Sequence, residues 1–112
     1  MSQDVSVAPL DKEFYNPVVT FAFEQVTVST TAIGLTTATY SPGTKGTAML
    51  ATIIVETAGL RYRKDGTDPT SSVGMPLAAG DVLYVWGSVD IKNIKFIRSS
   101  GSNATISVEY AN

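Results

Sequence analysis

The feature that most constrains this chain is the alternation of apolar and polar side chains with a period of two residues. Val26 and Val28 alternate with polar neighbours, and Val82, Tyr84 and Trp86 share one face of their segment. This period is typical of half-buried β-strands. Threonine (14) and serine (11) supply 25 of the 112 residues, and β-branched threonine fits a pleated surface better than a helix. The sequence therefore favours strands.

About seven strands are predicted at intervals of roughly 8–12 residues, and no segment gives a convincing helix signal. An antiparallel sandwich or a small barrel fits this spacing, and 112 residues suffice for one such domain. We expect an all-β fold, a small jelly-roll-like antiparallel β-sandwich of about seven to eight strands with an extended N-terminal arm. The segments with strand signals are residues 18–29, 32–40, 47–57, 60–64, 82–86, 91–98 and 104–110.

Local patterns sharpen three of these predictions. Residues 47–57 are apolar on both faces over much of their length, as in the central strand of a sandwich. Residues 87–90 are expected to turn the chain into a strand over 91–98. The loop at 99–103, rich in serine and glycine, is expected to close a hairpin with the last strand.

Residues 1–17 differ from the rest and are predicted to form an extended arm, with the β-sandwich domain over 18–112. Three acidic residues against one lysine give the arm a charge of 1 − 3 = −2, which is the net charge of the whole chain. The arm is either a frayed terminus or a segment that docks on a neighbouring subunit, and two adjacent aromatic residues favour docking. The arm residues proposed for that interface are Val7, Leu10, Phe14 and Tyr15.

Missing residue types exclude several chemistries. Without cysteine, the chain has no disulfides, thiolate nucleophiles or cysteine metal sites, and without histidine it lacks the commonest metal ligand and general base. A net charge of −2 argues against nucleic-acid binding, since nucleic-acid binders carry an excess of positive charge. No apolar stretch is long enough to span a bilayer, and no signal peptide is visible. We expect neither nucleic acid nor membrane as a partner.

The acidic residues give no strong catalytic or metal signal. The run Asp65-Gly66-Thr67-Asp68 faintly resembles a calcium loop but lacks the later ligands, so a turn capped by its own short side chains is favoured. The ten acidic residues are scattered, which does not favour a glycosidase pair. No enzyme activity, catalytic residue, cofactor or metal is predicted.

Two groups of side chains are candidate binding residues. Arg61, Arg63 and Lys64 form a basic cluster that would pair with acidic residues of a partner, such as the arm of a neighbouring copy. Tyr84 and Trp86, with Tyr62, could instead stack on a sugar, although aromatic residues of β-sandwiches more often lie in the core or in a subunit interface.

Residues 26–110 resemble a domain of small structural proteins from tailed-bacteriophage virions. The resemblance rests on motifs in a shared order, and the N-terminal arm lies outside it. These motifs are Val26-Thr27-Val28, Gly34-Leu35, Ala38-Thr39-Tyr40, Leu60-Arg61-Tyr62-Arg63, Asp65-Gly66-Thr67-Asp68-Pro69-Thr70, Gly74, Leu77, Ala79-Gly80-Asp81, Ile91 to Ile94, Lys95-Phe96-Ile97-Arg98 and Ala104 to Tyr110.

The resemblance implies a virion component made in the bacterial host cytoplasm. A capsid decoration protein is the first expectation, with other virion proteins, above all the major capsid protein, as partners and with self-association into a homo-oligomer. A tail, baseplate or fibre-attachment subunit is the alternative within virions. A carbohydrate-binding β-sandwich module is the alternative outside structural roles.

Overall fold

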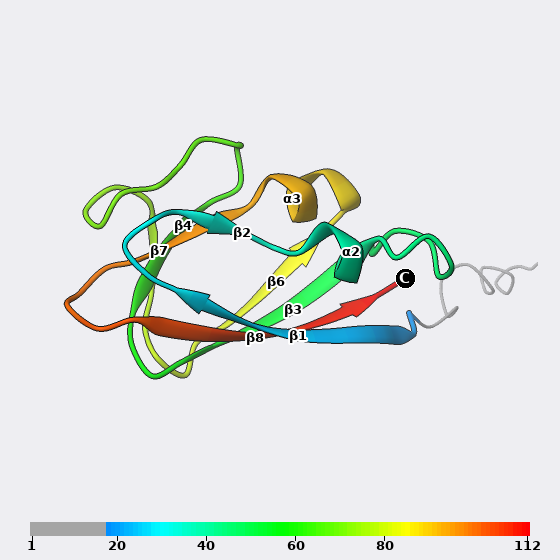
Figure 1. Cartoon of the computed structure of the whole chain (residues 1–112), viewed down its shortest axis with the longest axis horizontal. Coiled ribbons are helices and arrows are strands. Elements are labelled where there is room, and N and C mark those ends of the chain that lie inside the picture. The colour runs from blue at the N-terminus through cyan, green and yellow to red at the C-terminus, as the bar shows by residue number, and fades with distance from the viewer. Residues whose placement is uncertain (1–17) are drawn as a thin grey trace, which may run out of the picture.

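The computed structural model describes residues 18–112, which form eight strands and two short helices (Figure 1). None of the helices in this part of the chain could cross a membrane. The arm, with Val7, Leu10, Phe14 and Tyr15, lies outside the described residues. In chain order the elements are β1 (Thr20–Val28), β2 (Ile33–Gly34), α2 (Thr37–Tyr40), β3 (Leu50–Glu56), β4 (Leu60–Arg63), β5 (Met75–Leu77), β6 (Val82–Trp86), α3 (Ser88–Asn93), β7 (Lys95–Arg98) and β8 (Ala104–Ala111).

The strands form two antiparallel four-stranded sheets that pack as a sandwich, as the sequence predicts. Sheet A has the order β1-β8-β3-β6, and sheet B has the order β2-β7-β4-β5. Within these orders β1 pairs with β8, β2 with β7, β3 with β6 and β4 with β5. The first half of the chain therefore pairs with the second half in a nested series, which is the jelly-roll arrangement.

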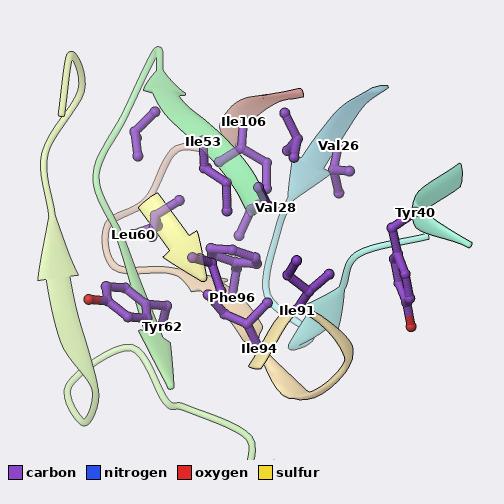
Figure 2. Packing of buried hydrophobic residues seen from close by; sticks show 14 of the residues in the cluster. Val26, Val28, Tyr40, Ile53, Leu60, Tyr62, Ile91, Ile94, Phe96 and Ile106 are labelled. Carbon is purple, nitrogen blue, oxygen red and sulfur yellow. The ribbon is translucent and has the colours of Figure 1, made fainter. Parts of the chain in front are cut away.

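Side chains from the inner faces of both sheets fill the space between the layers (Figure 2). Ile53 and Ile106 come from sheet A, and Leu60 and Phe96 come from sheet B; all four are fully buried. The ring of Phe96 lies 6.4 Å from that of Tyr62, in a tilted arrangement that aromatic pairs favour. Tyr62 thus faces inward between Arg61 and Arg63.

The apolar residues of strand β1 do not all face the core. The run Val19, Phe21 and Phe23 alternates as a strand face should, yet Phe23 is 60% exposed whereas Val26 and Val28 are buried. After a register shift between Thr20 and Ala22, the pairing of β1 with β8 is regular from Ala22 to Val28. Because the side-chain period is two, the odd-numbered Phe23 and the even-numbered valines lie on opposite faces.

The prediction of a turn at 87–90 followed by a strand over 91–98 was wrong for its first half. Residues Ser88–Asn93 form α3, and only Lys95–Arg98 form a strand. Ile91 and Ile94 are both fully buried. In a strand, residues three apart point to opposite faces, whereas in a helical turn they share one. The prediction that the chain lacks helices also missed α2, a single turn over Thr37–Tyr40.

Two further local predictions were corrected. Residues 99–103 do not close a hairpin, because β7 lies in sheet B and β8 lies in sheet A, so this loop crosses between the layers. Residues 75–77, which lie outside the segments with strand signals, form the short edge strand β5. The prediction for 47–57 was confirmed: β3 lies inside sheet A, between β8 and β6.

Candidate functional site

The outer face of sheet A carries a group of apolar side chains, most of them exposed, which we call the aromatic surface: Leu50, Ile54, Val82, Tyr84 and Trp86. Tyr84 is 59% exposed and Trp86 is 63% exposed. Val82 and Ile54 are also exposed, and Leu50 is half-buried. Contiguous apolar patches of this kind mark interaction sites on soluble proteins.

Strand register explains why these five side chains gather. In the β3–β6 ladder Leu50 lies opposite Trp86, and Ile54 lies opposite Val82. Tyr84 stands between them, opposite Thr52. Because alternate residues face opposite sides of a sheet, the intervening Val85 points inward and is fully buried. The sequence predicted that Val82, Tyr84 and Trp86 share a face, but the two β3 residues enter the surface only through the pairing.

The aromatic surface occupies one half of the sheet. On the other half, β1 and β8 present mostly polar side chains to the same side, among them Gln25, Ser107 and Glu109. Phe23 is the exception, and it stands on β1, at the opposite edge of sheet A. The outer face therefore grades from polar at β1 to apolar at β6.

Tyr62 does not belong to this surface. It is buried between the layers, against Phe96, so the three aromatic residues that the sequence grouped together divide into one core residue and two surface residues. Their strands explain the division, since β4 lies in sheet B and β6 lies in sheet A.

Arg61, predicted to meet an acidic partner, bonds to its own chain. Its Nε donates to the carbonyl of Ser71 at 3.1 Å, and its Nη1 donates to the carbonyl of Gly74 at 2.8 Å. Gly74 has a φ of 142°, and a Cβ there would lie 3.2 Å from the Tyr62 carbonyl oxygen. Arg61 therefore fastens the 64–74 loop to β4, and glycine at 74 permits the close approach.

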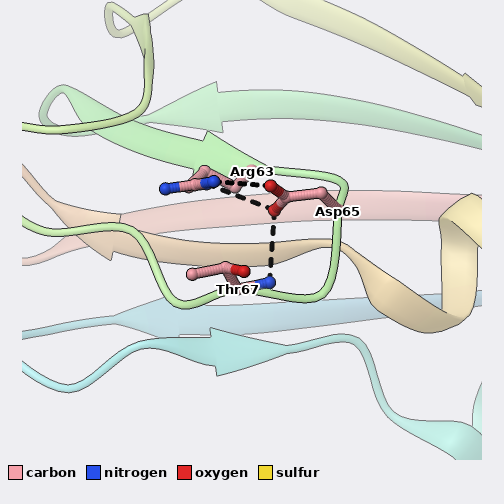
Figure 3. Close-up of polar contacts among 3 residues, drawn as sticks. All are labelled: Arg63, Asp65 and Thr67. Atoms are coloured by element: carbon pink, nitrogen blue, oxygen red, sulfur yellow. Dashed lines mark hydrogen bonds and ion pairs between the residues drawn. The ribbon is translucent and has the colours of Figure 1, made fainter.

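Arg63 forms a forked ion pair with Asp65 (Figure 3). Nη2 lies 2.5 Å from Oδ2, and Nε lies 3.2 Å from Oδ1, which also accepts the backbone N–H of Thr67. The hydrogen bond from Arg63 and the N–H of Thr67 lower the pKa of the Asp65 carboxyl. This geometry confirms the predicted turn capped by its own side chains.

An open groove of about 670 Å³ lies beside this pair. The charged residues along it, Arg63, Lys64, Asp65 and Asp90, sum to zero. Its apolar part comes from Val73 and Met75, which are both more than half exposed. The groove thus offers no net charge to attract an acidic segment, although Lys64 borders it.

Several acidic side chains in the described range accept hydrogen bonds from their own chain. Asp68 lies 3.5 Å from Nζ of Lys95, and Asp81 accepts the N–H of Ala78 at 2.7 Å. Within residues 18–112 no three acidic side chains gather in a way that could hold a metal ion. The aromatic surface is therefore the feature of this region with the clearest capacity to bind another molecule.

Comparisons with protein-family models, with curated proteins and with solved structures found no match to this chain. The function has to be argued from the chain's own residues.

Proposed function

We propose that this protein is a structural component of a tailed-bacteriophage virion, and specifically a capsid decoration protein that binds the assembled capsid through protein–protein contacts. The observation that carries the proposal is the aromatic surface, where Tyr84 and Trp86 stand exposed on a sheet face. The resemblance of residues 26–110 to virion proteins supplies the biological setting. The jelly-roll fold also occurs in viral capsid domains, a fold-level analogy that is compatible with this role.

The chemistry of the surface suits a mechanical role. Tyrosine and tryptophan bring large apolar areas with a polar tip and few rotatable bonds, and both are enriched where binding energy concentrates in interfaces. Covering them with a flat partner removes apolar area from water at about 25 cal/mol per Å². On a capsid, many identical copies would bind at once, so a modest affinity for each site is enough to coat the particle.

Co-sedimentation with capsids of the phage that encodes the chain tests the proposal. The wild-type protein should pellet with assembled capsids and saturate at a fixed ratio to the capsid subunits. Replacing Tyr84 and Trp86 together by alanine should weaken binding at least about tenfold, since each is expected to supply more than 1 kcal/mol. Phe23→Ala is the matched control, because Phe23 is equally exposed on the same face but stands outside the aromatic surface.

Labelling of purified virions separates the two virion locations. Antibody label distributed over the head supports decoration, whereas label confined to the tail assigns the protein to the tail, baseplate or fibre-attachment machinery. Absence of the protein from purified virions would overturn the proposal in both forms.

A carbohydrate-binding role is the second candidate. One observation favours it: Tyr84 and Trp86 are two residues apart on one face, so their rings stand about 7 Å apart along the strand. Stacked aromatic side chains at that spacing can contact successive sugar rings. Titration with bacterial surface glycans, followed by the emission of Trp86, tests this role; saturable binding lost in Trp86→Ala, with capsid binding absent, would favour it.

A further inference from the structure

The four sheet edges of the sandwich differ in how they are protected. In sheet B, β2 is two residues long and β5 contains Pro76, and both features prevent further strand pairing. In sheet A, α2 lies against β1, and the Glu24 carboxylate of β1 accepts the N–H of Thr36 at 3.1 Å. The remaining edge, β6, contains no proline and, in the described part of the chain, has no such side-chain bond, although α3, which follows it in the chain, also contacts it.

The backbone of β6 is open on its outer side. Val82–Trp86 pairs with β3 alone, and within residues 18–112 no other segment forms a backbone hydrogen bond with this strand. Its sequence, Val-Leu-Tyr-Val-Trp, contains no charged residue and no proline. An apolar edge strand of this kind is a template for another strand.

The position of the aromatic surface points to the same edge. Its exposed side chains lie on β6 and on the neighbouring β3, while the outward side chains of β8 and β1 are polar apart from Phe23. A strand added beside β6 would cover the flanks of Tyr84 and Trp86 and would satisfy the open backbone groups together. A partner lying flat over the middle of sheet A would instead meet Glu109 and Ser107.

We propose that β6 pairs with β6 of a second copy, antiparallel and about a two-fold axis at Tyr84. Tyr84 is the middle residue of the five-residue strand, so this register pairs every residue of β6. Tyr84 then lies opposite the partner's Tyr84, and Trp86 lies opposite the partner's Val82. Two sheets A join into one eight-stranded sheet, and such closed two-fold pairing is the commonest form of self-association.

Charge favours a second copy over the N-terminal arm. The arm carries a charge of −2, and the nearest charged residues on this face of sheet A are Glu56 and Glu109, whereas β6 is uncharged and does not repel itself. Edge-to-edge pairing covers the backbone edge and only the flanks of Tyr84 and Trp86, so the interface is no larger than the lower end of specific interfaces, about 1,000 Å², and we expect a micromolar dissociation constant.

This dimer does not depend on the capsid role. The paired strands keep their aromatic side chains on the outer face of the joined sheet, where they remain available to a flat partner. Failure of one proposal therefore leaves the other to be decided by its own experiment.

The wild-type full chain supplies a direct readout, because Trp86 is its single tryptophan. Sedimentation velocity from about 1 µM to 1 mM should show a monomer–dimer equilibrium. The emission of Trp86 should shift to shorter wavelength over the same concentrations, as its flank leaves water. A protein that stays monomeric over this range would overturn the proposal, and so would dimerisation that leaves Trp86 emission unchanged.

Charge exchange at the axis tests the register. In this register residue 84 of one copy lies opposite residue 84 of the other. Tyr84→Lys and Tyr84→Glu should therefore each raise the dissociation constant at least about tenfold, because like charges directly opposite are unfavourable. An equimolar mixture of the two variants should dimerise again. Phe23→Lys and Phe23→Glu are matched controls on β1, at the opposite edge of sheet A, and should dimerise as the wild type does.

Three results would overturn the assignment. Dimerisation of either Tyr84 variant alone with wild-type affinity would place the contact elsewhere. Mixed variants that both remain folded, by circular dichroism, yet stay monomeric would exclude the two-fold register at Tyr84. Loss of dimerisation on deleting residues 1–17 from an otherwise folded chain would assign the contact to the arm.

Discussion

The hydroxyl of Tyr110 donates a hydrogen bond of 2.5 Å to the carboxylate of Glu24, which joins two inward-facing side chains of the paired strands β8 and β1. Tyr110 is fully buried, and the same Glu24 oxygen accepts the backbone N–H of Thr36 just before α2. A carboxylate on the inner face is thereby supplied with two donors. Burial without such donors would be unfavourable, so this pair helps to fix α2 against the edge of sheet A.

Tyr110→Phe should destabilise the fold. The change keeps the ring but removes one of the two donors to the Glu24 carboxylate, and a hydrogen bond to a charged group contributes about 1.5–3 kcal/mol. Urea unfolding at pH 7 measures the loss. Tyr40→Phe is the matched control, since the Tyr40 hydroxyl only shares a 3.2 Å contact with the Thr37 hydroxyl and should cost less. Equal losses in the two variants would contradict the role given to Glu24.

The same pair predicts a dependence of stability on alkaline pH. Burial, and then the hydrogen bond to Glu24, raise the pKa of Tyr110 well above its ordinary value of 10.0. Above pH 10 the unfolded chain releases this proton while the folded chain keeps it, so the unfolded state binds fewer protons and the free energy of unfolding falls by up to about 1.4 kcal/mol per pH unit.

Tyr110→Phe lacks this proton. The stability gap between wild type and variant should therefore be constant below about pH 9 and should shrink between pH 10 and 11. Urea unfolding of both proteins across this range measures the gap. A gap that stays constant to pH 11 would show that Tyr110 ionises equally in the folded and unfolded chains.

Arg61→Ala should loosen the 64–74 loop. The variant removes the donors to the carbonyls of Ser71 and Gly74, which should cost about 1 kcal/mol and speed amide exchange at residues 70–74. Hydrogen exchange followed by mass spectrometry measures the effect. Lys64→Ala removes the same charge from the neighbouring groove and should leave exchange in this loop unchanged; a matching increase there would attribute the effect to charge alone.

Local patterns in the sequence predicted most of the strands but not how they pair. The nested jelly-roll pairing brings Thr20 beside Ala111, and nothing within a short window of sequence records a contact between residues so far apart. Where a local signal existed, the spacing of apolar residues distinguished a helix from a strand. The spacing of Ile91 and Ile94 fits one helical turn and does not fit a strand with both residues in the core.

The candidate site shows the same limit. Alternation along β6 was enough to place Tyr84 and Trp86 on one face, but their exposure depends on that face pointing away from sheet B. Ile54 could have been suspected as a member of the surface, because a strand apolar on both faces needs cover on both. The contacts of Arg61 depend on the path of a loop and left no periodic signal.

Alanine substitution should separate Tyr62 from Tyr84. Tyr62 is 8% exposed and packs on Phe96, so Tyr62→Ala should cost about 3–5 kcal/mol, as for other large buried aromatic residues. Tyr84 is 59% exposed, and Tyr84→Ala should change stability by less than about 1 kcal/mol. Urea unfolding at a protein concentration low enough to exclude self-association measures both. Similar losses would mean that Tyr84 is a core residue, contrary to its place in the aromatic surface.

Thr57→Asn should stabilise the turn between β3 and β4. Thr57 has a φ of 72°, a left-handed conformation that is unfavourable for a β-branched residue and tolerated by asparagine. Its hydroxyl donates to the carbonyls of Glu56 and Asn103, so the gain should be moderate, about 0.5–1 kcal/mol. Thr57→Val is the control: it keeps the branched Cβ in the same conformation and loses the hydroxyl, so it should destabilise. The midpoint of urea unfolding measures both changes. If both variants lose stability, the hydroxyl contacts outweigh the backbone strain, and this turn is held by its hydrogen bonds to the 99–103 loop.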